Sequence, residues 1–360
     1  MQWVSRQQAT VHPPGLSEEE KERYARQIRF SPIGEEGQAR LRRARVAIVG
    51  VGALGSALAN HMARAGVGYV RLIDGDIVDT SNLQRQMLFD EQDALNGTPK
   101  AAAAAEKLAA VNSGVEIEPH VVEVTWHNAE QLLSDVDLIL DGTDNFAARY
   151  LLNDVSVKHG IPYVYGGIVG ASGSSAFFWP EKTPCLACLY PEPPLPGNLE
   201  TCETAGIIGP VVHFITAFQA TEALKYLAGD IQHLSRRLIS VDLWNNQLLQ
   251  LPLAGKQNPN CPVCARRRFR YLEEQTSVIE EAVLCGKKAV QIRPHRPQRL
   301  DLAAMAERLS SYGQVEQNRF LVRLHLPSHT LVLFQDGRVL VQGTDDLAVA
   351  RRLYTHYFGM

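Results

Sequence analysis

The stretch Val46-Ala-Ile-Val-Gly-Val-Gly-Ala-Leu-Gly55 decides the fold of this chain. It begins with a short β-branched run, which is typical of a buried strand, and continues directly into a glycine-rich turn. A helical pattern follows over residues 56–65, and a second apolar run, Tyr69 to Ile73, ends at Asp74. The segment therefore predicts a strand, a tight turn, a helix and a second strand that ends at an acidic residue.

The same alternation extends on both sides of this segment. Thr98 and Pro99 are typical of the start of a helix, with Thr98 as N-cap. Alternating strands and helices predict a mostly parallel sheet with helices on both faces, in which ligands bind beyond the carboxyl ends of the strands. The other elements predicted in this half are helices over residues 16–43 and 146–159 and strands over residues 115–124, 136–140 and 163–165.

The pattern changes after Gly166. A strand over residues 171–178, an apolar helix over 211–227 and a hairpin of residues 238–243 and 247–251 are predicted. The tail has a separate α+β pattern with a hairpin signal at Asp336-Gly337. The boundaries that we predict are an N-terminal extension at 1–22, a main domain at 23–272, a linker at 273–288 and a small α+β domain at 289–360.

The composition excludes several classes of protein. The chain has 360 residues, with 36 Lys and Arg against 39 Asp and Glu, and a net charge of −3. This balance argues against a nucleic-acid partner. A hydrophobic content of 45% is enough for a sizeable core, and a charged content of 21% is too low for a disordered chain. No apolar run approaches the roughly 18 residues of a membrane span, and residues 1–15 lack the apolar core of a signal peptide. We therefore predict a cytoplasmic protein with no membrane partner.

The glycine-rich turn predicts a nucleotide site. Gly50, Gly52 and Gly55 fit the pattern G-x-G-x-x-G between a strand and a helix, where the backbone can approach a phosphate. Asp74 lies 19 residues beyond Gly55, which suits a ribose hydroxyl. By itself this motif indicates NAD, and the alternative without a ligand is a tight turn between strand and helix.

The polar segment from Asp74 to Gln86 indicates a different ligand. A dinucleotide dehydrogenase has no need of acids, amides and a guanidinium at this place, whereas a triphosphate does. Arg85 and Lys100 can neutralise a polyphosphate, and Asp144 can hold Mg²⁺. The alternative is a solvated loop with ordinary surface charges.

Four of the six cysteines predict a metal site. Cys185 with Cys188 and Cys261 with Cys264 form two C-x-x-C pairs, which together can supply four thiolates to a structural zinc ion. The alternatives are a redox pair or buried free thiols. Cys285 receives no role here.

The chain resembles the ThiF/MoeB group of adenylyltransferases, relatives of the ubiquitin-activating enzymes. The resemblance covers residues 23–264. The small C-terminal domain and residues 33–37 resemble Bacillus-type ThiF-like members in particular. The resemblance rests on the two cysteine pairs and on residues 23–27, 50–55, 81–86, 99–100, 141–145 and 201–206.

The resemblance implies ATP-dependent adenylation of the C-terminal Gly-Gly carboxylate of a ubiquitin-like sulfur carrier, of the ThiS or MoaD type. The pathway is thiamin thiazole or molybdopterin biosynthesis, and the resemblance favours thiazole. It also implies a Rossmann-like fold, a homodimer, a separate protein as sulfur donor, and sulfur chemistry as one of two roles for Cys202, the other being none. The implied roles are nucleotide binding by Gly50, Gly52 and Gly55, ribose binding by Asp74, phosphate contacts by Asn82, Arg85 and Lys100, Mg²⁺ binding by Asp144, and a γ-phosphate contact in the neighbouring subunit by Arg26.

Three alternatives stay open at this point. The same fold can adenylate a modified tRNA base, although the balanced charge and the zinc pairs argue against this. An NAD-dependent oxidoreductase leaves residues 81–86 without a purpose. A catalytically inactive binding module for a ubiquitin-like partner is opposed by the intact set of Arg85, Lys100 and Asp144.

Overall fold

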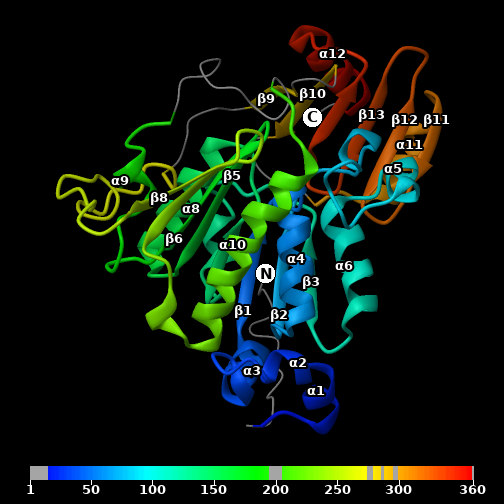
Figure 1. Ribbon diagram of the computed structural model, residues 1–360. Coiled ribbons are helices and arrows are strands. Elements are labelled where there is room, and N and C mark those ends of the chain that lie inside the picture. The colour runs from blue at the N-terminus through cyan, green and yellow to red at the C-terminus, as the bar shows by residue number, and fades with distance from the viewer. Residues whose placement is uncertain (1–14, 194–204, 274–278, 285–287, 295–298, 359–360) are drawn as a thin grey trace, which may run out of the picture. The chain divides into compact units, whose positions relative to one another are not determined.

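The structure, a computed structural model, describes residues 15–193, 205–273, 279–284, 288–294 and 299–358 (Figure 1). The chain divides into two compact units, residues 1–273 and residues 274–360. The larger unit contains the residues that the sequence analysis assigns to nucleotide and metal sites.

The larger unit is built on a sheet of eight strands. Their order is β3-β2-β1-β4-β5-β6-β7-β8. The first five strands in this order are parallel, and the last three continue the sheet in antiparallel fashion. The strands are β1 Arg45–Val49, β2 Tyr69–Ile73, β3 Glu116–His120, β4 Leu138–Asp141, β5 Tyr163–Val169, β6 Ser172–Phe178, β7 Arg237–Asp242 and β8 Gln247–Pro252. The predicted, mostly parallel α/β sheet is confirmed.

Helices cover both faces of this sheet. Val46 and Ile48 of β1 belong to a core that includes residues of α4, α6 and α10, whereas Ala47 and Val49 belong to a core with residues of α7 and α8. Side chains alternate along a strand, so a strand that is apolar at every position can be buried on both faces. The helices of this unit are α1 Glu18–Arg23, α2 Ala25–Ile28, α3 Gly34–Arg43, α4 Ala53–Ala65, α5 Glu91–Asn96, α6 Lys100–Val111, α7 Ala129–Leu133, α8 Phe146–His159, α9 Leu186–Leu189 and α10 Gly209–Ala228.

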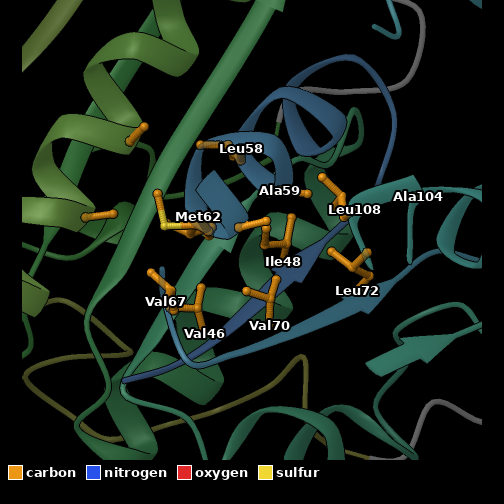
Figure 2. Packing of buried hydrophobic residues seen from close by; sticks show 14 of the residues in the cluster. Val46, Ile48, Leu58, Ala59, Met62, Val67, Val70, Leu72, Ala104 and Leu108 are labelled. Carbon is orange, nitrogen blue, oxygen red and sulfur yellow. The ribbon is translucent and has the colours of Figure 1, made fainter. Parts of the chain in front are cut away.

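The core on the α4 face is closely packed (Figure 2). Leu58 and Met62 of α4 lie over the β1 and β2 side chains and are fully buried. Full burial of a side chain of this size stabilises the fold by about 1.5–3 kcal/mol. Because α4 begins where β1 ends, this packing also fixes the position of the glycine-rich turn between them.

Two of the elements predicted in this unit have different bounds in the structure. The single helix predicted over residues 16–43 is three short helices, because Tyr24 lies outside helical geometry between α1 and α2 and the turn through Pro32 interrupts the helical backbone before α3. The strand predicted over residues 115–124 ends at His120, because its partner β2 ends at Ile73, which pairs with His120.

In its described residues the smaller unit contains a six-stranded antiparallel sheet and two helices, with a separate core. Its strand order is β11-β12-β13-β14-β10-β9. The predicted hairpin turns at Gly337, whose φ of +87° lies in the left-handed region. The elements are β9 Ile279–Leu284, β10 Ala289–Pro294, α11 Leu302–Leu309, β11 Gln314–Gln317, β12 Leu321–His325, β13 Thr330–Phe334, β14 Val339–Gln342 and α12 Leu347–Phe358.

The segment predicted as a linker, residues 273–288, includes β9. This strand pairs with β10 in antiparallel register, from Leu284 opposite Ala289 to Ile279 opposite Pro294. The ladder of hydrogen bonds to β10 holds residues 279–284 as a strand, although their own sequence has a weak strand signal.

Candidate functional site

Three parallel strands end at one level of the larger sheet. Val49 of β1 is in register with Ile73 of β2 and with Asp141 of β4. The residues that follow, Gly50, Asp74 and Gly142, therefore begin three neighbouring segments at the carboxyl edge of the sheet. The sequence-predicted site residues Gly52, Gly55, Lys100 and Asp144 belong to these segments and to the helix that packs beside them. This is the edge at which open α/β sheets bind ligands.

The glycine-rich turn is tightly packed at two of its three glycines. Gly50 has a φ of +79°, and a Cβ atom on Gly55 would lie 1.8 Å from the Gly50 carbonyl oxygen. Gly142 packs against the same oxygen, because its Cβ would lie 2.2 Å away. Gly52 differs, since a Cβ there meets only the Gln86 amide nitrogen, at 3.6 Å. Gly52 therefore leaves open space at the N-terminus of α4, where backbone N–H groups favour an anion.

We expect Gly55→Ala and Gly52→Ala to differ sharply in stability. The methyl group of Gly55→Ala collides with backbone that cannot move aside, and we expect a loss of about 3 kcal/mol or more. Gly52→Ala, the matched control, places the same methyl group in ordinary van der Waals contact with Gln86, and we expect a loss of about 1 kcal/mol. Urea unfolding followed by circular dichroism measures both, and equal losses would contradict this account of the turn.

Asp74 fixes the end of β2 to the glycine-rich turn. One carboxylate oxygen accepts the Val51 N–H at 2.7 Å, and the other accepts the Asp76 N–H at 2.7 Å. Burial raises the pKa of Asp74 above its ordinary value, and the positive charge of Lys100 opposes that rise. Each oxygen has two acceptor sites, so the carboxylate keeps capacity for hydroxyl groups of a ligand.

Lys100 is a buried cation at the first position of α6. Its ammonium group lies 2.9 Å from a carboxylate oxygen of Asp76. Burial by itself would lower the pKa of Lys100, but Asp76, Asp74 and Asp144 together raise it above the ordinary value. Lys100 therefore carries its charge at neutral pH and has three carboxylates within electrostatic range.

The start of α6 differs from the prediction. Pro99 and not Thr98 is the N-cap residue, and no side chain caps the helix. The reason is that the Thr98 carbonyl accepts the Val78 N–H at 2.8 Å and Pro99 pairs with Ile77, so both residues are extended.

Asn82 and Arg85 belong to a short polar segment that follows β2. Asn82 is buried, and its side-chain oxygen accepts the Asp79 N–H at 3.2 Å within a reciprocal cap. Arg85 is half-buried and donates to the Ser81 carbonyl at 2.8 Å. Both side chains are thus held by their own turn, which begins six residues after β2 with Asp79.

Gln86, which has no predicted role of its own, ends this polar segment. It is buried, and its side-chain oxygen has no hydrogen-bond partner in the described part of the chain. Its amide group lies next to Gly52. In the sequence, the position of Gln86 at the end of the polar motif is its only sign of a function. Its place beside the glycine-rich turn is visible only in the structure.

The turn after β4 contains two aspartates in different surroundings. Asp141 is fully buried and accepts the Thr143 N–H and hydroxyl, at 2.9 and 2.7 Å, and the Tyr163 hydroxyl at 2.6 Å. Burial raises the pKa of Asp141, and Arg149 opposes that rise. Asp144, in contrast, is exposed and is available to a ligand. The two acids therefore have different roles. Asp141 stabilises the turn through its hydrogen bonds, and Asp144 extends from that turn into solvent.

Arg26 does not join this group within one chain. It is exposed on α2, and the adjacent Gln27 donates to the Ala65 carbonyl at the last turn of α4. The glycine-rich turn lies at the other end of α4 (Figure 1). A helix of 13 residues is about 20 Å long, which separates Arg26 from the carboxyl edge of its own sheet.

The four predicted metal-binding cysteines lie together. Their sulfur atoms all fall within 4.8 Å of one another, with separations of 3.9 Å for Cys185–Cys188, 3.7 Å for Cys185–Cys261 and 3.4 Å for Cys188–Cys264. A tetrahedral Zn²⁺ with Zn–S bonds of about 2.3 Å requires sulfur atoms about 3.8 Å apart. The cluster therefore fits a closed structural zinc site that joins α9 to the segment after β8.

The surroundings of the cluster favour a thiolate. The Cys185 thiol donates to the Cys188 sulfur, and the close approach of the sulfur atoms lowers the pKa of Cys188 while it raises the pKa of Cys185 and of Cys264. The Asn258 N–H also approaches the Cys188 sulfur, at 3.5 Å. Metal ligation requires thiolates, so zinc binding to the four cysteines would release the thiol protons that remain.

We expect Cys261→Ser to remove zinc and to destabilise the larger unit. Cys261 is fully buried in the cluster, and loss of a structural metal is among the few causes of single-site losses of about 4 kcal/mol or more. Zinc content by mass spectrometry and thermal unfolding measure the effect. Cys285→Ser is the control, for which we expect full zinc content, and wild-type zinc content in Cys261→Ser would refute the assignment.

Cys202 and Cys285 lie outside the described residues, together with the rest of residues 194–204 and 285–287. In the ranges that the structure covers, no helix has the length and apolar character needed to cross a bilayer.

Comparison with known proteins links the chain to one family. The profile described as the ThiF family matches residues 24–263. The Sulfur carrier protein ThiS adenylyltransferase of Bacillus subtilis is 43% identical over 340 residues, which cover 94% of this chain and 99% of the relative. The Sulfur carrier protein adenylyltransferase of Thermus thermophilus is 38% identical over 275 residues, covering 75% of this chain and 98% of the relative.

A solved structure shares the fold. The crystal structure of Escherichia coli MccB with ATP has a TM-score of 0.59 and 22% sequence identity, and the match covers 67% of this chain and 74% of that chain. At this identity the likeness concerns the fold alone.

Proposed function

The chain belongs to the ThiF family, and from this premise we propose that it uses ATP to adenylate the C-terminal Gly-Gly carboxylate of a ubiquitin-like sulfur carrier. The products are an acyl-adenylate and pyrophosphate. The names of the Bacillus and Thermus relatives, both sulfur-carrier adenylyltransferases, support this proposal. The observation that carries it is the buried, charged Lys100 with Asp74, Asp76 and Asp144 around it, at the sheet edge where α4 begins.

The reaction needs positioning and charge neutralisation more than acid–base catalysis. A carboxylate is already ionised at neutral pH, so no general base is required for its attack on the α-phosphate. The difficulty is that two anions must meet, and positive charge has to offset their repulsion. Lys100 and Arg85 supply that charge in our proposal, and Asn82 adds an amide contact to the phosphates.

The remaining nucleotide contacts follow from the same arrangement. Gly52, at the open N-terminus of α4, leaves room for a phosphate within the loop that Gly50 and Gly55 close. The free acceptor capacity of Asp74 suits the ribose hydroxyls. Exposed Asp144 would hold Mg²⁺, which neutralises charge on the phosphates when it is bound.

The proposal includes a homodimer. Arg26 lies about one length of α4 from the site of its own chain, so in our proposal it reaches the γ-phosphate bound to the partner. A separate protein supplies the sulfur, and Cys202 either takes part in sulfur transfer or has no chemical role. The four cysteines of the described cluster are not joined by disulfides, which suits a reducing compartment, and we propose the cytoplasm.

ATP–pyrophosphate exchange tests the function. Labelled pyrophosphate is incubated with the zinc-loaded protein, ATP and Mg²⁺, with either a ThiS-type or a MoaD-type carrier. Carriers that lack the terminal Gly-Gly are the matched controls. We expect exchange only with an intact carrier, and with the thiazole-type carrier in particular.

The results with the two carriers distinguish between the two pathways and test the proposed function itself. Exchange with the MoaD-type carrier alone would assign the molybdopterin pathway, and exchange with both carriers would identify a shared activator. Exchange with neither carrier would overturn the proposal. A modified tRNA base would then be the next substrate to test, and NAD binding would be the next measurement.

A further inference from the structure

Arg149 is a buried cation beneath the turn that presents Asp144. It occupies the first turn of α8, and its Nη2 atom donates to the Thr143 carbonyl at 2.8 Å and to the Gly166 carbonyl at 3.2 Å. Its Nε atom lies 3.5 Å from a carboxylate oxygen of Asp141. One side chain therefore joins the turn after β4 to strand β5.

The contacts of Arg149 matter for Asp144 because one of them is made to the residue directly before it. The carbonyl that Arg149 holds belongs to Thr143, which directly precedes Asp144, so it fixes the peptide plane from which Asp144 extends. Asp141 holds the other side of Thr143, through the N–H and the hydroxyl. Thr143 is thus held by two buried, oppositely charged side chains, while Asp144 itself stays exposed.

Aromatic side chains restrict the guanidinium further. Its central carbon lies 5.3 Å from the ring centroid of Phe146 and 5.4 Å from that of Tyr165, within the range of cation–π attraction. A planar group held by two rings and two carbonyls has little freedom to turn. Lys cannot reproduce this, because a single ammonium lacks the planar fork of donors.

We propose that Arg149 is the positioning residue for Asp144, and that it holds the turn of residues 141–145 in the orientation in which the Asp144 carboxylate meets a divalent cation. This inference rests on the proposed adenylation function for its kinetic readout, but not for its binding readout. Arg149 touches no substrate in this proposal and acts through the Thr143 backbone.

The electrostatics agree with this geometry. Burial by itself would lower the pKa of Arg149, yet Asp141 and, more weakly, Asp144 raise it above the ordinary value. Asp144 also contributes to the raised pKa of Lys100. The exposed carboxylate therefore lies within electrostatic range of two buried cations, one on α8 and one on α6.

Arg71 offers a matched control for the test. The Arg71 side chain is 9% exposed and that of Arg149 is 8% exposed. Arg71 likewise pairs with a carboxylate, Asp135, and donates to a backbone carbonyl, that of Leu132. Arg71 lies on β2, away from the turn of Asp144. Substitution of either arginine removes a buried cation, but only substitution of Arg149 removes the hydrogen bond to the Thr143 carbonyl.

The experiment compares Arg149→Met with Arg71→Met. Binding of Mn²⁺ as a probe is followed by electron paramagnetic resonance in the presence of ATP and without any carrier. Mg²⁺ titrations of pyrophosphate exchange give kcat and KM. For Arg149→Met we expect weaker Mn²⁺ binding and a higher half-saturating Mg²⁺ concentration, each by about 10- to 100-fold, as for other residues that orient a metal ligand. For Arg71→Met we expect lower stability with wild-type Mn²⁺ binding.

A third variant keeps the test decisive where Arg149→Met does not fold. Arg149→Lys preserves the charge opposite Asp141, and we expect the same loss of Mn²⁺ binding. Equal Mn²⁺ affinity in the wild type and in a folded Arg149 variant would overturn the positioning role, as would an equal loss in Arg71→Met. If the wild type bound Mn²⁺ with ATP but showed no exchange with either carrier, the adenylation proposal would fail and the comparison of Mn²⁺ affinities would still decide the role of Arg149.

Discussion

Asp144→Ala is expected to lose carrier-dependent pyrophosphate exchange while the protein stays folded. The side chain is exposed, so its removal leaves the cores and the cysteine cluster unchanged. In the proposed reaction, however, Asp144 provides the carboxylate that holds Mg²⁺ against the phosphates. Loss of one such preorganised electrostatic group lowers a rate by about 100-fold or more.

Asp144→Asn makes this test specific for charge, because the amide has nearly the same size as the carboxylate. We expect the same loss of exchange, since a neutral amide binds Mg²⁺ far more weakly than a carboxylate does. Circular dichroism, thermal unfolding and zinc content serve as controls for the fold. Full activity of either variant at ordinary Mg²⁺ concentrations would refute the proposed metal role of Asp144.

Arg26→Ala and Arg85→Ala are expected to be inactive alone and active when mixed. In our proposal each ATP site uses Arg85 from one subunit and Arg26 from the other. A dimer of one chain of each variant then contains one site with both arginines and one site with neither. Random exchange of equal amounts makes half of the dimers mixed, so we expect about one quarter of the wild-type sites to work.

Subunit exchange has to be demonstrated for this measurement, with differently tagged chains recovered in one dimer. Exchange activity near one quarter of the wild-type value supports the shared site. No recovery after demonstrated subunit exchange would refute it. Full activity of Arg26→Ala alone would show that this arginine has no role.

The larger fold could be predicted from the sequence because its signals are local. The β-branched runs before Gly50 and Asp74 and the helical patterns between them define parallel strands joined by helices. The short strands of the small domain were harder to predict. The sequences of β9 and β11 have weak strand patterns, and these strands are held by pairing with β10 and β12. The break near Pro32 was missed because the charged residues on both sides favour a helix.

The candidate site could be predicted in part for the same reason. The residues that follow strand ends are visible in the sequence, and parallel strands bring their carboxyl ends to one edge. The roles of Gln86 and Arg149 were not predicted, because they depend on burial or on contacts with residues distant in the sequence. A sequence motif contains neither kind of information. Arg149, for example, is 17 residues from Gly166, whose carbonyl it holds.

By itself the sequence determined the parallel α/β architecture and which residues follow the strand ends, because hydrophobic periodicity and glycine conformations act over a few residues. Only the tertiary structure decided that four sulfur atoms from pairs 76 residues apart meet at metal-binding distances. It alone decided that Asp141 is buried and Asp144 exposed, and that Arg26 lies far from the site of its own chain. These outcomes depend on burial and on contacts between distant segments, which exist only once the sheet and its helices have packed.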